Sequence, residues 1–204
     1  MDGPDPSSRM RSRADAVDAT RARILDAALE AFGARPYDQV TIVGLAREAG
    51  VSHQTLLNHF HSKEGLYLAA VETVGARIAE LRAGARPGDV TSIVGALVDQ
   101  YEEFGDGNAR AAALDERIPT VAAMLARARA YHQDWLAQMF ADRLPPGGKA
   151  RREALAALHA ATDVFTWKLL RRDLRLSRRV TQDIMVRLVT GVLAAEPPET
   201  GGLP

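Results

Sequence analysis

The sequence predicts an all-α fold of about nine helices, in which a small N-terminal three-helix domain precedes a larger helical bundle. Apolar residues recur three and four positions apart over most of the 204 residues, as on the buried face of a helix. No stretch alternates apolar and polar residues in the manner of a half-buried strand. Glycines and prolines divide the chain into segments of helical length.

The composition limits the classes of protein that the chain can be. Hydrophobic residues make up 47% and charged residues 25%, which is ordinary for a folded globular protein. The 26 Lys and Arg residues balance the 26 Asp and Glu residues, so any nucleic-acid-binding surface must be local. The chain has no cysteine, which excludes disulfides and thiolate chemistry. No apolar run has the length of a signal peptide or a membrane span, and we expect a cytoplasmic protein.

The first segment is polar, and the second has a helical pattern. Residues 1–17 contain two prolines and several arginines, so we expect them to form a flexible arm. Helical periodicity starts near Thr20 and ends at Gly33. The arginines of the arm are Arg9, Arg11 and Arg13.

The segment TIVGLAREAGVSHQTLLNHF at positions 41–60 predicts a helix-turn-helix. Thr41 is a favoured N-cap for one short helix, and Ser52 is a favoured N-cap for the next. A glycine turn joins them, and Leu56 and Phe60 lie four residues apart on the buried side of the second helix. Such a turn sets the second helix steeply across the first, so that its exposed face can enter a DNA major groove.

The exposed face of that second helix carries polar side chains that suit base edges. Gln54 and Asn58 can read adenine, and His53 can reach bases or phosphates. The free N–H groups at the start of the helix favour a phosphate beside Ser52. The sequence therefore predicts a DNA-binding domain at residues 18–65.

The remainder of the chain predicts a helical domain at residues 66–197 and a disordered tail at residues 198–204. A helix opened by Ser62 runs to a break at Gly84. The Arg-rich stretch at residues 171–179 is expected to be a solvated corner between helices. Further helices are expected at 89–104, 108–127, 128–143, 149–173 and 178–195.

Residues 20–74 resemble the N-terminal domain of the TetR family of bacterial regulators. The matching segment is ARILDAALEAFGARPYDQVTIVGLAREAGVSHQTLLNHFHSKEGLYLAAV, with its cap, its Ala-Gly-Val-Ser turn and its Ser-Lys-Glu at fixed spacing. The resemblance implies that His53, Gln54 and Asn58 face bases. It also implies phosphate contacts from Thr41, Ser52, Thr55, His59 and Lys63.

The sequence departs from the family pattern at Leu57, where the family usually has a Tyr that contacts the DNA backbone. A thymine methyl group is a possible partner for Leu57. Gly44 lies inside the first short helix, where it should cost roughly 1 kcal/mol relative to Ala, and the sequence gives no reason for it.

The resemblance further implies a homodimer that represses transcription from a pseudo-palindromic operator and is released by a small, largely apolar effector. The family pairs its last two helices with those of a second subunit. Dimer contacts are therefore expected from Leu158, Phe165, Leu169, Ile184, Leu188 and Val192. Aromatic and methionine side chains of the larger domain are candidates for a ligand pocket. These are Tyr101, Phe104, Met124, Tyr131, Trp135 and Phe165.

The alternatives are a helical protein-interaction module, or an activator without a small-molecule ligand. An enzyme is not expected, because the sequence has no nucleophile elbow, phosphate-binding loop or di-metal motif. The remaining ionisable candidates have no catalytic spacing. They are His132, Asp134, His159 and Asp163. We expect no cofactor and no metal, because the pair His59 and His61 has no further ligand at suitable spacing.

Overall fold

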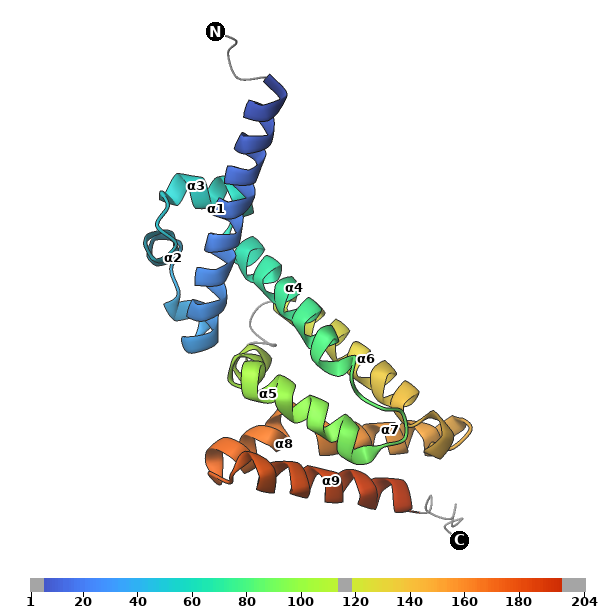
Figure 1. Ribbon diagram of the computed structural model, residues 1–204. Coiled ribbons are helices and arrows are strands. Elements are labelled where there is room, and N and C mark those ends of the chain that lie inside the picture. Colours follow the sequence, from blue (N-terminus) through green and yellow to red (C-terminus); the bar gives the residue numbers. More distant parts are fainter. Residues whose placement is uncertain (1–5, 114–118, 196–204) are drawn as a thin grey trace. The chain divides into compact units, whose positions relative to one another are not determined.

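The computed structural model describes residues 6–113 and 119–195, and within these ranges the chain forms helices and no strand (Figure 1). The all-α prediction is therefore confirmed. The chain divides into two compact units, with the division between Ala76 and Arg77. No helix in the described ranges is both long enough and apolar enough to cross a membrane.

The first unit contains α1 (Pro6–Ala34), the 3-10 turn η1 (Tyr37–Gln39), α2 (Ile42–Glu48), α3 (His53–Phe60) and the first part of α4 (Lys63–Arg82). Helix α2 packs against both α1 and α3. The core is apolar and contains side chains from all four helices. Its most deeply buried members include Ile24, Ala28, Leu45, Leu56 and Leu66.

Helix α1 begins well before the expected start near Thr20. It is helical from Pro6, so the prediction of a flexible arm over residues 1–17 is wrong from Pro6 onward. A proline suits the first turn of a helix, because the missing N–H has no partner there in any case. The side chains at positions 13–19 are exposed, so local propensity rather than packing supports this part of α1. The side chains of Arg9 and Arg11 lie outside the described part.

The division between the units falls later than the boundary expected after residue 65. The first part of α4 belongs to the N-terminal core, where Tyr67 is buried. The Tyr67 ring lies edge-on to Phe32, with centroids 4.9 Å apart, and to Tyr37 at 5.3 Å. Helix α4 therefore contributes to both units along one continuous helix.

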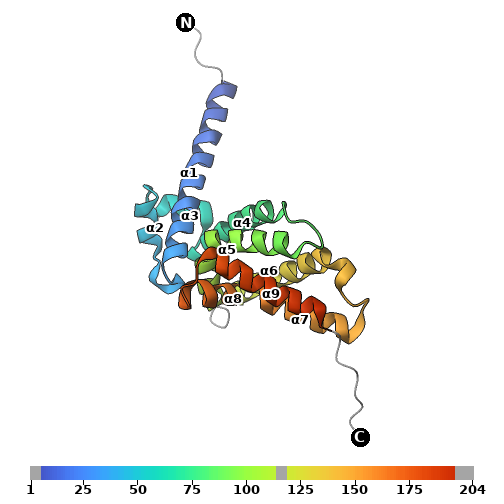
Figure 2. The ribbon, with the colours of Figure 1, turned by 60° about the horizontal axis from the view of Figure 1, so that its bottom comes forward.

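The second unit contains the end of α4, α5 (Val90–Ala112), α6 (Pro119–Met139), η2 (Ala141–Arg143), α7 (Gly148–Thr162), α8 (Val164–Lys168), the π-helical turn η3 (Leu169–Asp173) and α9 (Arg178–Ala194). Helix α5 packs against α8 and α9, and α7 packs against α6 and α9 (Figures 1 and 2). Its core is built around Trp167, Leu97, Leu136, Phe140 and Met185.

Several expected helix boundaries in the second unit are wrong. Helix α5 continues through the Gly-Asp-Gly-Asn stretch to Ala112, because Gly105 serves close packing rather than a break. One helix, α6, spans residues 119–139, where a break was expected after residue 127. Asp163 divides the segment expected to be one helix over residues 149–173, because its carboxylate caps α8 by accepting from the N–H of Phe165 at 2.8 Å.

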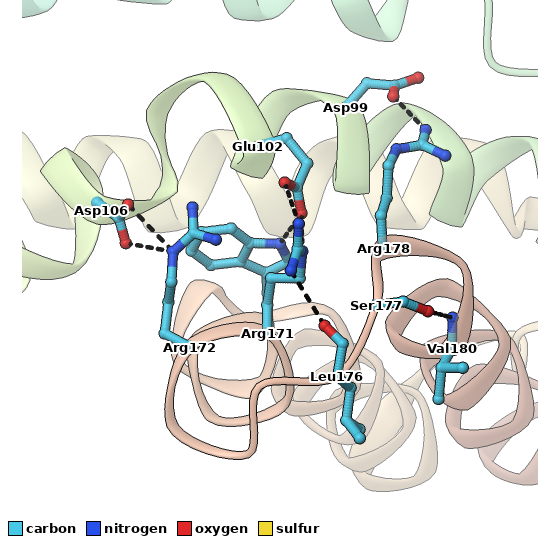
Figure 3. A network of polar contacts seen from close by, with 10 residues as sticks. Asp99, Glu102, Asp106, Arg171, Arg172, Leu176, Ser177, Arg178 and Val180 are labelled. Carbon is cyan, nitrogen blue, oxygen red and sulfur yellow. Dashed lines mark hydrogen bonds and ion pairs between the residues drawn. The ribbon is translucent and has the colours of Figure 1, made fainter.

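An ion-pair ladder joins α5 to the arginine-rich corner after α8 (Figure 3). Arg171 donates to Glu102 at 2.7 Å, and Glu102 also accepts from the indole N–H of Trp167 at 3.2 Å. The acidic partners, Asp99, Glu102 and Asp106, are spaced three and four residues apart on one face of α5. Their arginine partners are Arg178, Arg171 and Arg172, respectively. The stretch at residues 171–179, which was expected to be a solvated corner, is therefore joined to α5 by ion pairs.

Replacing Gly105 with Ala should destabilise the protein by roughly 1–3 kcal/mol. A Cβ atom at this position would lie 2.4 Å from Cζ3 of the buried Trp167 ring. Gly95→Ala in the same helix is the matched control. Its Cβ would meet only the flexible amide of Gln182 at 3.4 Å, so we expect a gain of up to about 1 kcal/mol. Urea denaturation measures both, and equal effects would contradict the close packing of α5 against Trp167.

Candidate nucleic-acid interface

Helix α2 is fixed at its start by a side-chain cap. The hydroxyl of Thr41 accepts from the N–H of Gly44 at 3.1 Å. A Cβ atom at position 44 would lie 3.0 Å from that hydroxyl oxygen. Gly44, which has no evident role in the sequence, therefore leaves room for the cap.

The turn between α2 and α3 depends on Gly50, whose φ of 65° lies in the left-handed region. Directly after it, the N–H of Val51 donates to the carbonyl of Ala46 at 2.9 Å and closes the end of α2. Ser52 then caps α3 by accepting from the N–H of Thr55 at 3.0 Å, and the two hydroxyl oxygens lie 2.8 Å apart. The structure thus brings the Ser52 and Thr55 hydroxyls together at the start of α3.

Helix α3 buries one face and exposes the other. Leu56 and Phe60 are buried, while His53, Gln54 and Asn58 are exposed. The side-chain amide of Gln54 donates to the side-chain carbonyl of Asn58 at 2.9 Å. This leaves the Gln54 carbonyl oxygen as an acceptor and the Asn58 amide as a donor. Adenine presents the complementary donor and acceptor in the major groove.

Lys63, at the start of α4, rests on an aromatic platform. Its ammonium lies 4.0 Å from the centroid of the Tyr37 ring, which in turn stacks on Phe32 with centroids 5.7 Å apart. Partial burial lowers the pKa of Lys63, and the nearby Asp38 opposes that shift. The platform holds the lysine in one place close to the end of α3. The role of Tyr37 could not be predicted from the sequence, because a single ring in a 3-10 turn gives no periodic signal.

Gly65 allows α4 to begin directly after α3. A Cβ atom there would lie 2.3 Å from the backbone carbonyl oxygen of Phe60, a distance that no side chain tolerates. His61, at the end of α3, has φ of 63°, so the backbone reverses sharply between the two helices. The remaining side chains expected at DNA, Leu57 and His59, are partly buried on α3.

One exposed residue of this region was not predicted. Val43, on α2, is 67% exposed although it is apolar. It lies two residues after the Thr41 cap on the surface of the short helix, where an apolar side chain makes no favourable contact with water. An apolar residue in a helical pattern is expected to be buried, so the sequence does not indicate that Val43 is exposed.

The residues expected at a dimer interface differ in exposure. Leu158 is fully buried in the core of its own unit, so its assignment to an interface is wrong. Phe165, Leu169 and Leu188 are 49%, 50% and 44% exposed. Ile184 and Val192 are partly buried against the core. Three of the expected residues, one each on α8, η3 and α9, are therefore exposed apolar side chains.

The ligand candidates are divided between core and surface. Tyr101 and Trp135 lie in the core of the second unit, and Met124 is also buried. Tyr131 and Phe165 are about half exposed. The remaining candidate, Phe104, is partly buried.

The second unit also contains a largely buried polar cluster, which includes three of the four ionisable candidates that the sequence offered. The imidazole rings of His132 and His159 meet edge to face, with centroids 4.9 Å apart. Asp163 lies 3.4 Å from Nε2 of His159. Asp134 is exposed, and no hydrogen bond in the described part of the chain joins it to these groups. Among the described residues, no group of three or more His, Asp or Glu side chains is arranged to hold a metal ion.

One family model matches most of the predicted DNA-binding domain. Residues 24–70 match the family model described as bacterial regulatory proteins, tetR family. This range covers the end of α1, both helices of the helix-turn-helix and the start of α4. No curated protein matches the chain.

Solved structures share the fold over most of the chain. A TetR-family transcriptional regulator from Streptomyces coelicolor has 20% identity and a TM-score of 0.66, over 89% of this chain and 91% of its own. A transcriptional regulator from Rhodococcus has 17% identity and a TM-score of 0.70, over 85% and 95%. NalD from Pseudomonas aeruginosa, the secondary repressor of the MexAB-OprM multidrug efflux pump, has 22% identity and a TM-score of 0.60, over 86% and 97%.

Acid should destabilise the fold through His132. Burial, the Arg82 charge and His159 lower the pKa of His132 from 6.5 to about 3, while Asp163 opposes them. Between these values the unfolded chain binds a proton that the folded chain does not. The free energy of unfolding should therefore fall between pH 7.5 and pH 4, by roughly 3 kcal/mol from this residue. Urea denaturation of the wild type and of His132→Gln at both pH values isolates this contribution, and an equal fall in both proteins would contradict it.

Proposed function

We propose that this chain, whose residues 24–70 match the family model of the tetR bacterial regulatory proteins, is a sequence-specific regulator of transcription that binds operator DNA. The exposed pair of Gln54 and Asn58 on α3 carries this proposal. The pair offers a donor and an acceptor on the outer face of the second helix of a helix-turn-helix, the element that enters the major groove. Leu56 and Phe60 hold the opposite face in the core.

Phosphate contacts are assigned to the groups that surround this face. The Ser52 and Thr55 hydroxyls stand at the start of α3, and Thr41 stands at the start of α2, where free backbone N–H groups attract an anion. Lys63 adds a positive charge at the start of α4. His59 completes the set on α3. On the base side, Leu57 and the exposed Val43 offer apolar contacts to thymine methyl groups.

Two copies of the chain would place two such helices on a two-fold axis and select a pseudo-palindromic operator. The exposed apolar side chains of Phe165, Leu169 and Leu188 support self-association through α8, η3 and α9. In water, so large a set of exposed apolar groups gains stability when a second copy covers it.

The regulation that we propose is repression relieved by a small molecule bound in the second unit. Helix α4 has residues in both units, with Lys63 at its start and Arg82 at its end. An effector acts only through its different affinity for the two conformations of the dimer. The described function of NalD as a repressor supports this sign of regulation.

Replacing both Gln54 and Asn58 with Ala should relax the base preference at one position of each half-site. The wild type and the double variant are each used to select binding sites from random duplex DNA. We expect the wild type to enrich a pseudo-palindrome and the variant to enrich it with that position degenerate. Gln133→Ala, a change at an exposed position of α6, should select the same site as the wild type. If the double variant selects an unchanged site with unchanged affinity, the assignment of the base-reading pair is wrong.

Replacing Lys63 with Ala should weaken binding to all sequences alike. One phosphate contact is lost per protomer, so the slope of log affinity against log salt should fall by about one unit for each lysine that contacts DNA. A fluorescence anisotropy titration of the selected duplex at several salt concentrations measures this slope. Lys149→Ala, an exposed lysine of α7 paired with Glu153, should leave it unchanged. An unaltered slope in Lys63→Ala would remove this residue from the interface.

A further inference from the structure

Arg82 is a buried cation without a carboxylate partner among the described residues. Its side chain is at the end of α4, and the residue is 5% exposed. Nε donates to the side-chain oxygen of Gln100 at 2.7 Å, and Nη2 lies 3.1 Å from Nδ1 of His132. Both partners are uncharged in this arrangement. A guanidinium removed from water to this extent is ordinarily paired with an anion.

The hydrogen-bond chain around His132 requires this imidazole to be neutral. The hydroxyl of Thr162 donates to the carbonyl of Leu158 at 2.7 Å, so it accepts from Nε2 of His132 at 2.9 Å. With its proton on Nε2, His132 accepts from Arg82 at Nδ1. The ring therefore offers Arg82 a lone pair but no negative charge.

Two buried nitrogens in this cluster make no hydrogen bond. Nη1 of Arg82 has no partner, and neither has Nδ1 of His159. A buried charged group that lacks a hydrogen bond has lost its contacts with water without replacing them, which is unfavourable. Burial accordingly lowers the pKa of the Arg82 guanidinium. The buried guanidinium of Arg82 therefore lacks a hydrogen-bond acceptor at Nη1.

Aromatic rings surround the same guanidinium. It lies 4.6 Å from the centroid of the Trp135 ring and 5.5 Å from that of Tyr131. Trp135 is buried, whereas Tyr131 is 48% exposed. A small molecule that reached Arg82 beside Tyr131 would therefore meet apolar rings as well as the charge.

We propose that the second unit binds a small molecule that carries one carboxylate on an apolar body, with the carboxylate on Nη1 of Arg82. A carboxylate supplies the single negative charge that the guanidinium lacks, and two oxygens that accept from its N–H groups. This inference rests on the proposed function, since it names the chemical class of the effector.

A monoanion suits the cluster better than a phosphate. Asp163 already brings one negative charge next to His159, whose ring contacts that of His132. Its other oxygen is engaged as the α8 cap, so Asp163 is not free to pair with Arg82. Arg82 supplies a single positive charge to this cluster, so a ligand with two negative charges would bury its second charge there without a partner.

The test compares acids with their matched amides on the full-length protein. Acetate, hexanoate, decanoate and phenylacetate, with the corresponding primary amides and with inorganic phosphate, are titrated at pH 7.5. Isothermal titration calorimetry measures affinity, and the fluorescence of the chain's two tryptophans, one of which is Trp135, reports the site. We expect at least one acid of the longer or aromatic kind to bind once per protomer, and its amide to bind at least about tenfold more weakly.

Two variants locate the binding. Arg82→Met should abolish the preference for acid over amide, and Arg82→Lys, which keeps the charge, should retain part of it. Arg86→Met, at an exposed arginine four positions further along the chain, is the matched control and should bind as the wild type does. The inference is overturned if no acid binds, if acid and amide bind equally, if Arg82→Met retains the preference, or if inorganic phosphate binds as tightly as the acids.

The same preparations are titrated with the DNA selected by the wild type. Wild-type protein that binds this DNA but no acid would contradict the proposed ligand class and leave the DNA-binding function intact. Protein that binds an acid through Arg82 but selects no DNA sequence would contradict the proposed function instead. When both bind, the acid should weaken DNA binding by the wild type and not by Arg82→Met.

Discussion

The burial of one face of α3 in the core of the first unit is the constraint on which the proposed DNA-binding surface depends. Helices of seven and eight residues, such as α2 and α3, are too short to be stable alone in water. They persist because Leu45, Leu56 and Phe60 are buried together with α1. Since this burial fixes the rotation of α3 about its axis, it also fixes which side chains point outward.

Two glycines allow the close connections between α2, α3 and α4. Gly50 supplies the left-handed turn between α2 and α3, and Gly65 permits the close approach of α4 to the carbonyl of Phe60. The caps of Thr41 and Ser52 then satisfy the first N–H groups of each short helix. In the second unit, the ion-pair ladder on α5 plays a comparable part, because it fixes the corner between α8 and α9 (Figure 3).

The helix-turn-helix was the most predictable part of the chain, because its signals are local. A cap, a glycine turn and two apolar residues four apart determine it, and the structure confirms each of these features. The second unit was less predictable. Gly105 interrupts a helical pattern in sequence but packs under Trp167 in space, and only the fold shows which applies. Asp163 likewise caps α8 inside an apolar pattern that otherwise predicts one long helix.

Side-chain roles that depend on distant partners could not be predicted at all. Tyr37 supports Lys63, and Arg82 meets His132, fifty positions further along the chain. No spacing in the sequence links these residues. Conversely, Leu158 belongs to an apolar stripe that suits an interface equally well, but its own core covers it. Periodicity identifies an apolar face and not the partner that covers it.

Methylation interference on the DNA selected by the wild-type protein tests the central claim most directly. The modified position, N7 of guanine, lies in the major groove, where α3 should sit. If the chain is a dimeric operator-binding protein, interference should appear in two clusters related by two-fold symmetry and separated by about 10 base pairs, one turn of the duplex. Interference at a single cluster would contradict the dimer, and interference at none would contradict the account of α3 as the element that reads DNA.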